Sequence, residues 1–353
     1  MRVVYNSFSG RYSDSPRAVY ERLHDRPGLS HVWLADPAEQ TAFPADVTTV
    51  PVDGPEAVEA LEAADLVIAN SHTEVEWTKP AGATYVQIWH GTPLKRIHHD
   101  VLWAPEGRLS WLDQDVARWD LLLSPNAVST PRLRQAFRYD GEVLESGYPR
   151  NDLLSDPDGH VVRERVRKEL GLADDVTAVL YAPTWRDDLV LSGSQATLPW
   201  ALDFTQLTEH LGPGYHLLPR HHVMMTGRSE VAALPRVRDV STYPDIRHLY
   251  LAADAMVTDY SSAMFDFAIT GKPLLFYTYD FERFRDTVRG FYFDLVPQAP
   301  GPMVRTTAEL AEAVARLPAV AAKYADRYRR FAERYCSLAD GHATQRLLDH
   351  LGL

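Results

Sequence analysis

The chain has 353 residues, of which 45% are hydrophobic and 24% charged, and its formal net charge at pH 7 is −12. This length exceeds what a single hydrophobic core usually supports, so we expect two domains. The negative charge excludes a general attraction to nucleic acid or anionic lipid, and a phosphate-bearing ligand must therefore meet a local basic cluster. The single cysteine, Cys336, excludes an internal disulfide framework and fits a reducing compartment.

The sequence indicates neither a secretory signal nor a membrane-spanning segment. Residues 1–16 carry polar side chains where a signal peptide needs a continuous apolar core, so we expect the first strand of a domain there. The apolar runs all fall short of the roughly 18 residues that a membrane-spanning helix needs. We therefore expect a cytoplasmic protein, and any contact with the inner face of the cell membrane would be peripheral.

The first half of the chain alternates short apolar runs with amphipathic stretches, the pattern of parallel strands joined by crossover helices. One helix is predicted over residues 15–25, with Ser15 as its N-cap and Pro16 at the first helical position, and another over residues 54–64. Residues 1–150 are therefore predicted to form a doubly wound domain. Its strands are predicted at residues 2–8, 31–35, 48–52, 65–70, 84–90 and 120–126.

The second half repeats this alternation and then becomes helical. Residues 152–160, rich in Asp and Pro, are the predicted linker, and a helix over residues 161–171 is predicted to end at Gly171. We expect a second doubly wound domain over residues 151–335, and a terminal helix within residues 336–353 that packs back on the first domain. Strands are predicted at residues 177–185, 215–222, 238–243, 255–262 and 272–279, and further helices at residues 308–317, 323–335 and 342–351.

The expected fold class is α/β, with two Rossmann-like domains that face a central cleft. In open α/β sheets the carboxyl ends of the strands are the usual ligand position, so function should be sought at the strand ends. Neither half carries GxGxxG or GxxxxGK[ST] after its first strand, which counts against a dinucleotide cofactor and against a P-loop nucleotidase. The fold alone leaves the chemistry open.

Residues 87–100 form the densest polar group of the sequence. A β-rich stretch ends there at His90, Gly91 allows the backbone to turn, and Pro93 can open a helix whose first amides would favour an anion. A histidine at a strand end beside an anion site suits a general base, and His90 is our candidate for that role. The bland alternative is a structural histidine beside a turn.

Other residues of the same segment suit contact with a phosphate or an acceptor. Gly91 and Thr92 form the turn, and Lys95 supplies a cation directly after it. For the neighbouring pair His98 and His99, a structural role is the simpler explanation. These two are adjacent and the sequence has no HxxxH or CxxC, so no metal site is predicted.

A second polar group ends the predicted strand at residues 215–222. Alternation along a strand sends Arg220 and His222 to one face and His221 to the other. An arginine and an imidazole on one face suit a phosphate and its leaving oxygen. A solvated arginine at a strand end explains the same residues equally well.

Two further strand ends carry residues that suit a nucleotide. Asp259 can accept hydrogen bonds from ligand hydroxyls, and Ser261 and Ser262 can cap a helix whose free amides face a phosphate. Thr184 and Arg186 end another strand beside Trp185, which offers a stacking surface, and Arg186 is a bidentate phosphate donor. Simple helix capping and core packing of the tryptophan are the bland alternatives.

These motifs occur together and in one order along the chain: NSFSGRYSDSPRAVYERL, WHGTPLK, SGYPRNDLL, YAPTWRD, RHH, TDYSSAMFDFA, KPLLFYTYD, RGFYFD and PGP. In this combination the sequence resembles the CDP-glycerol glycerophosphotransferase family, the teichoic acid glycerol-phosphate primases and polymerases. Each motif alone is weak, but nine in order are specific, and the resemblance spans residues 1 to about 305. Longer members carry an extra N-terminal region, so this chain looks like a minimal version.

The resemblance implies a GT-B-like architecture with an acceptor-binding first domain and a CDP-donor-binding second domain. It implies transfer of glycerol phosphate from CDP-glycerol to a hydroxyl of a teichoic-acid-like or capsule polymer, by attack on the β-phosphorus with release of CMP, and no cofactor. His90 matches the family's base, and His222 matches a second functional histidine, which we also expect to be catalytic, with His221 as the alternative register. The positions that match the donor site are Thr184, Arg186, Arg220, Asp259, Ser261 and Ser262.

Two other enzyme classes compete with this interpretation. A CDP-ribitol or other CDP-polyol phosphotransferase would use the same motifs, and a GT-B nucleotide-sugar glycosyltransferase would share the fold. The expected partners are CDP-glycerol and a lipid-linked or polymeric polyol-phosphate acceptor, with no nucleic acid. The basic aromatic residues 323–335 fit either a peripheral membrane contact or a solvated helix, and the solvated helix is the commoner explanation.

Overall fold

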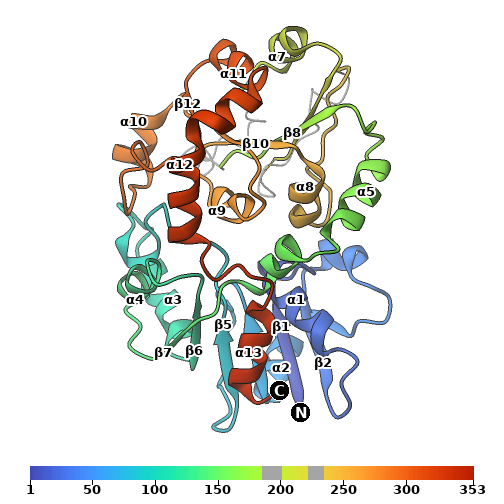
Figure 1. The fold of residues 1–353 in the computed structure, drawn as a ribbon. Helices are drawn as coiled ribbons and strands as arrows, with labels where there is room; N and C mark the ends of the chain where they lie inside the picture. Colours follow the sequence, from blue (N-terminus) through green and yellow to red (C-terminus); the bar gives the residue numbers. More distant parts are fainter. Residues whose placement is uncertain (185–200, 222–233) are drawn as a thin grey trace. The chain divides into compact units, whose positions relative to one another are not determined.

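The computed structural model describes residues 1–184, 201–221 and 234–353 (Figure 1). The chain folds into two compact units. Unit 1 contains Met1–Pro93, Ile97–Leu153 and Ser337–Leu353. Unit 2 contains Leu94–Arg96 and Leu154–Cys336. Each unit has one sheet in which every strand pair is parallel. The expected α/β class with two parallel sheets is confirmed.

The sheet of unit 1 has the order β3-β2-β1-β4-β5-β6-β7. All six predicted strands are present, although β5 stops three residues before His90. The edge strand β7 was missed because its residues are exposed or only half-buried, and charged edge positions hide the apolar pattern of a strand. The strands are β1 (Arg2–Asn6), β2 (Ser30–Ala35), β3 (Thr49–Pro51), β4 (Leu66–Ala69), β5 (Thr84–Gln87), β6 (Leu121–Ser124) and β7 (Glu142–Glu145).

The helices of unit 1 cover the sheet and include the end of the chain. Leu347 and Leu348 of the last helix are fully buried in the cluster that holds Tyr5 and Trp33 of the sheet. The last helix of the chain therefore packs in the same core as the first two strands. The elements are α1 (Asp14–Leu23), η1 (Pro37–Ala42), α2 (Pro55–Glu62), η2 (His98–Asp100), α3 (Arg108–Val116), α4 (Thr130–Phe137), η3 (Pro149–Ser155, which runs into unit 2) and α13 (Ala343–Leu351).

The predicted N-cap of the first helix was wrong. Helix α1 begins at Asp14 and its N-cap is Ser13, so Ser15 lies inside the first turn. The physical reason is that the carboxylate of Asp14 accepts a 2.7 Å hydrogen bond from the amide of Ser15 and satisfies a helix-start donor there. Asp14 also has a left-handed backbone, with φ of 59°.

The sheet of unit 2 has the order β12-β11-β10-β8-β9. The strand predicted at residues 238–243 was wrong, although Arg238 and Val240 do donate backbone hydrogen bonds to β9. Asp239 accepts bonds from the amide and hydroxyl of Ser241, and such a local turn competes with a strand ladder. The strands are β8 (Thr177–Tyr181), β9 (Tyr215–Pro219), β10 (Ala255–Thr258), β11 (Leu274–Tyr277) and the unpredicted β12 (Met303–Val304).

The helices of unit 2 include the long α12, drawn in red in Figure 1. Helix α5 ends as predicted, because Gly171 follows the C-cap with a left-handed φ of 64°. Among the residues that the structure describes, no helix has the length and apolar character to cross a membrane. The elements are α5 (Gly159–Glu169), α7 (Phe204–Leu211), α8 (Ile246–Ala252), α9 (Ala263–Ala268), α10 (Phe281–Arg283), η5 (Phe284–Val288), α11 (Thr307–Val314) and α12 (Leu317–Tyr335).

Candidate active site

Each sheet has one topological switch point, on either side of which successive strands are added in opposite directions. In unit 1 the order reverses between β1 and β4, and in unit 2 it reverses between β8 and β10. In open α/β sheets, ligands bind outside the carboxyl ends of the strands at such a reversal. The polar residues that follow these four strands, and those that follow their neighbours β5 and β9, are therefore the candidate site residues.

His90 lies beside the reversal point of unit 1. Its Nδ1 is 2.6 Å from the carbonyl oxygen of Asn70, the residue after β4. A carbonyl can only accept, so Nδ1 carries the proton and Nε2 keeps its lone pair. The ring also packs against Trp89 and Phe8, with centroids 4.1 and 5.2 Å away. Nε2 is therefore available as a base on an oriented imidazole.

The electrostatic surroundings keep His90 neutral at pH 7. Burial lowers the pKa of His90 to about 4, while the Asn70 carbonyl and the Asp14 carboxylate act against this shift and Arg150 adds to it. A neutral imidazole can accept a proton from an acceptor hydroxyl without first having to lose one.

An ion pair that the sequence analysis missed lies near His90. Arg150 Nη1 is 3.2 Å from Asp14 Oδ1, and these side chains are only 4% and 12% exposed. Asp14, in the SDSP stretch, is the first residue of α1, and Arg150, in SGYPRND, lies in η3 after β7. A charged residue at the start of a helix was the only local signal for either position, and nothing in the sequence pairs the two.

The helix predicted after Pro93 was wrong. The segment beyond His90 stays irregular as far as η2. Leu94 accepts a hydrogen bond from the amide of Tyr292, and the amide of Arg96 donates to Gly290, so the backbone of this segment pairs with another strand-like segment. Lys95 forms an antiparallel bridge with Phe291 in the same stretch. The anion site at a helix start therefore does not exist here.

The turn residues before that segment are buried in unit 1. Thr92 is 3% exposed, and Gly91 is buried as well. The left-handed backbone of this turn lies at Trp89, with φ of 59°, and the Gln87 side chain accepts a 2.9 Å bond from the Trp89 amide. The side chain of Gln87 thus helps to set the direction in which His90 projects.

In unit 2, Asp259 joins the two strands at the reversal point. Its Oδ1 accepts hydrogen bonds from the amides of Thr184 at 2.8 Å and Tyr260 at 2.5 Å. The residue is only 1% exposed, and Thr258 adds a 2.7 Å bond to the carbonyl of Ala182. Asp259 therefore fixes the backbone after β8 and β10.

Arg220 is held at the end of the neighbouring strand β9. Its amide bonds the Tyr181 carbonyl at 2.8 Å, and its Nη1 donates to the carbonyls of Val240 and Tyr243 at 2.9 and 2.7 Å. This guanidinium is oriented by the backbone rather than freely solvated. Burial lowers the pKa of the adjacent His221, and Asp239 opposes that shift.

The two serines after β10 differ in what they bond. Ser261 Oγ accepts a 3.2 Å bond from the amide of Ala263. Ser262 is the N-cap of α9 and makes no side-chain capping bond. The structure thus brings together Thr184, Arg220, Asp259, Ser261 and Ser262 at the carboxyl ends of three neighbouring strands of unit 2. The predicted Arg186 and His222 lie outside the described residues.

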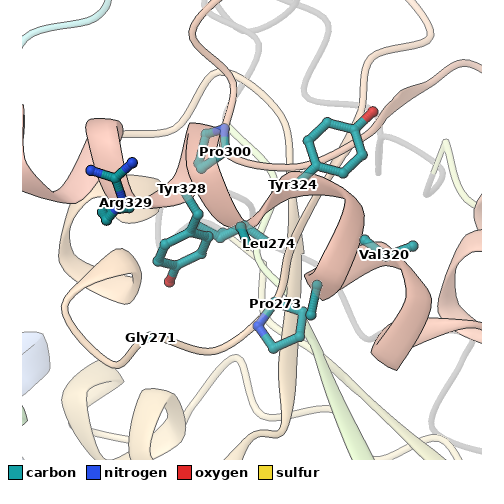
Figure 2. Close-up of a pocket in the computed structure, with 10 residues that line it drawn as sticks. Gly271, Pro273, Leu274, Pro300, Val320, Tyr324, Tyr328 and Arg329 are labelled. Atoms are coloured by element: carbon teal, nitrogen blue, oxygen red, sulfur yellow. The ribbon is translucent and has the colours of Figure 1, made fainter.

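A cavity of about 270 Å³ in unit 2 lies elsewhere, beside α12 (Figure 2). Tyr324, Tyr328 and Arg329 of α12 line it together with Pro273 and Leu274 at the start of β11. The Tyr328 hydroxyl donates to the carbonyls of Ala268 and Lys272, so this side chain holds α12 against the turn between α9 and β11. None of the predicted site residues lines this cavity.

A family model described as CDP-Glycerol:Poly(glycerophosphate) glycerophosphotransferase matches residues 1–352. The chain belongs to this family. The resemblance that the ordered motifs indicate is therefore confirmed over nearly the whole chain, and it includes the segments that carry His90 and Asp259.

The glycerophosphotransferase relatives and structures agree with this assignment. The chain is 34% identical to the teichoic acid poly(glycerol phosphate) polymerase of Bacillus subtilis (strain 168), over 98% of this chain and 48% of the relative. It is 34% identical to the teichoic acid glycerol-phosphate transferase of Staphylococcus aureus (strain NCTC 8325 / PS 47), over 98% of this chain and 91% of the relative. It therefore spans about half the length of the first relative.

A solved structure of the wall teichoic acid polymerase TagF, a histidine-to-asparagine variant soaked with CDPG, has a TM-score of 0.91 to this chain at 32% identity. The match covers 99% of this chain and 88% of that one. The described parts of the chain therefore share the fold of this polymerase.

Proposed function

We propose that this glycerophosphotransferase-family chain transfers glycerol phosphate from CDP-glycerol to a hydroxyl of a teichoic-acid-like or capsule polymer. The observation that carries the proposal is the hydrogen bond from His90 Nδ1 to the Asn70 carbonyl, at 2.6 Å. It leaves Nε2 as a base in the tautomer that the reaction needs, at the strand end where α/β sheets bind their ligands.

In the proposed reaction, the proton of the acceptor hydroxyl passes to His90 Nε2. The acceptor oxygen bonds to the β-phosphorus of CDP-glycerol, the bond from that phosphorus to the bridging oxygen breaks, and CMP leaves with the electron pair. In phosphoryl transfer the protein mainly positions the groups and neutralises the charge on the transferring oxygens. We assign the ion pair of Asp14 and Arg150 a supporting role, because its two buried charges are paired with each other and lie near His90.

We assign the donor to unit 2, at the carboxyl ends of β8, β9 and β10. Arg220 and the amides after Ser261 would meet the pyrophosphate, with Ser262, Thr184 and, outside the described residues, Arg186 as further contacts. His222, also outside the described residues, is assigned as the second catalytic residue, at the phosphate and its leaving oxygen. The buried Asp259 has a positioning role in this assignment, because its Oδ1 already accepts two backbone amides. Gly91, Thr92 and Lys95 are assigned to the acceptor or to a phosphate.

The proposed acceptor is lipid-linked or polymeric, which would place the reaction in the cytoplasm at the inner face of the membrane. The test is incubation of the purified chain with CDP-glycerol, CDP-ribitol or a UDP-sugar, each with a lipid-linked glycerol-phosphate acceptor. CMP release and a mass increase of one or more glycerol phosphate units with CDP-glycerol alone would support the proposal. Transfer from CDP-ribitol at an equal rate would assign a broader polyol activity, and release of UDP would overturn the reaction class.

A further inference from the structure

Three side chains of unit 1, outside the residues assigned to the reaction, come together between η2 and α3. His99 Nε2 lies 2.8 and 3.1 Å from the two carboxylate oxygens of Asp113. His98 Nδ1 lies 3.9 Å from Asp113 Oδ1. One nitrogen from each histidine and one oxygen of Asp113 all lie within 4.8 Å of one another.

The environment of His98 is unusual for a structural histidine. Its side chain is 2% exposed, and neither ring nitrogen has a hydrogen-bond partner. Burial lowers the pKa of His98, and the nearby Ala136 carbonyl, which makes no hydrogen bond of ordinary geometry with the ring, only partly opposes that shift. Burying a polar group without a partner costs roughly 1–3 kcal/mol, and a ligand bound at Nδ1 would remove that cost.

The distances fit a tetrahedral metal ion. With metal–ligand bonds of about 2.1 Å, tetrahedral ligand atoms lie about 3.4 Å apart. The separations of 2.8 Å for His99 and 3.9 Å for His98 from Asp113 Oδ1 lie on either side of this value. The Asp113 side chain is 40% exposed, which gives an ion a route from solvent.

We propose that His98, His99 and Asp113 bind one divalent transition-metal ion, with Zn²⁺ as the best fit. Two imidazoles and one carboxylate are ligands that zinc commonly accepts, and water can supply a fourth. A simple His99–Asp113 hydrogen bond would explain the 2.8 Å contact but would leave the buried His98 without a ligand.

The site would fasten η2 to α3. Its residues follow the segment that carries His90, Gly91 and Thr92, so the ion would stabilise the part of unit 1 that holds the proposed base. The role is structural, because none of the three ligands is assigned to the reaction. His72 lies beside the site with its ring 5.3 Å from that of His98, and its Nδ1 is 3.3 Å from Asp115.

The test uses the full chain, freed of metal by dialysis against a chelator and then titrated with Zn²⁺ against a chromophoric competitor. We expect one Zn²⁺ per chain and an affinity that falls by about 100-fold or more in Asp113→Asn and His99→Ala, since even the loss of a group behind a ligand costs about 10–100-fold. The matched control is His24→Ala, which removes a histidine paired with Asp25 at 3.2 Å on the surface of the same unit.

Two further measurements guard against a variant that fails to fold. Metal-free wild type and Asp113→Asn, whose changed side chain is partly exposed, should melt at similar temperatures, and Zn²⁺ should raise the melting temperature of wild type alone. Co²⁺ should give the visible absorption of a tetrahedral site in wild type. Equal Zn²⁺ affinity in wild type and both variants, or less than stoichiometric binding by wild type, would overturn the proposal.

Discussion

The Nδ1 of His90 donates a 2.6 Å hydrogen bond to the main-chain carbonyl of Asn70, across two neighbouring strands of one sheet. Because the partner is backbone, the tautomer of His90 depends on the register of β4 and β5 rather than on another side chain. The buried Asn70 also accepts the amide of Phe8 at 3.0 Å, so three segments meet around this imidazole. The base is thus oriented by the sheet before any ligand arrives.

Replacement of His90 is expected to remove transfer and leave the fold intact. His90→Ala should lower the rate of CMP release by about 10²–10⁴-fold, the usual contribution of a general base. Donor binding should be nearly unchanged, because the donor is assigned to unit 2. The control is His160→Ala, since His160 also has its Nδ1 near a carbonyl, that of Pro157 at 3.0 Å, but lies on an exposed helix end. Near wild-type turnover in His90→Ala would remove the assignment.

The pKa of His90 gives a prediction for stability. The unfolded chain protonates this histidine near pH 6.5 and the folded chain only near pH 4, so the unfolded state binds more protons between these values. The free energy of unfolding should therefore fall as the pH drops from 6.5 towards 4. Urea titrations at pH 7 and pH 5 test this, and the loss should be smaller in His90→Gln. An identical loss in both proteins would contradict the pKa shift.

Much of the fold and part of the site could be predicted because the signals are local. Apolar runs that end in polar residues marked β4, β5 and β10. They placed Asp259 directly after its strand, and His90 beyond β5, which ends at Gln87. Parallel buried strands read as continuous apolar runs, which is why these elements were visible. The ordered motifs then carried the family assignment.

The remaining features depend on pairing between distant residues. Asp14 and Arg150 are 136 positions apart, and no local pattern couples them. The pairing of Arg96 with Gly290 likewise overrode the expected helix after Pro93. At Asp239 the error was local, because a side-chain turn to Ser241 outweighed strand propensity.

The Pro300-Gly301-Pro302 motif should be intolerant of any side chain at its glycine. A Cβ at Gly301 would lie 1.7 Å from the carbonyl oxygen of Leu274, in the backbone of β11. Gly301→Ala must therefore displace the strand, and overpacking of this kind costs about 1–3 kcal/mol or more. Thermal unfolding measures the effect. Gly214→Ala is the control, because a Cβ there meets nothing within 4 Å. Equal melting temperatures for both variants would show that β11 shifts at little cost in free energy, which would contradict the prediction.

A chelator is expected to lower the melting temperature of the chain and to leave its transfer rate unchanged. EDTA should leave the initial rate of CMP release unchanged at a temperature well below unfolding, because the proposed reaction uses an imidazole, arginines and backbone amides. The same treatment should lower the melting temperature if His98, His99 and Asp113 hold an ion. The two readouts are taken on one sample. Loss of rate that Zn²⁺ or Mg²⁺ restores would show a metal in the reaction itself.

Arg220 should contribute to donor binding in unit 2. Its amide is tied to Tyr181 and its guanidinium to Val240 and Tyr243, so it is held in place at the strand end where we assign the pyrophosphate. A charge-assisted contact is worth roughly 1.5–3 kcal/mol, or about one to two decades in affinity. Arg220→Ala should therefore weaken CMP or CDP-glycerol binding by that amount in a calorimetric titration, and leave acceptor binding unchanged.

The structural bonds of Arg220 make a control necessary, because its loss also frees two carbonyls. Arg238→Ala provides one: this guanidinium donates to the carbonyl of Leu170 at 2.9 Å in the same unit but is not assigned to the donor. If both variants lose stability and only Arg220→Ala loses affinity for CMP, the lower affinity comes from a lost contact between Arg220 and the donor. If the two lose affinity equally, Arg220 acts through the backbone alone. Cytidine bound at the Gly91–Thr92 turn in a crystal soak would reverse the assignment of donor and acceptor to the two units.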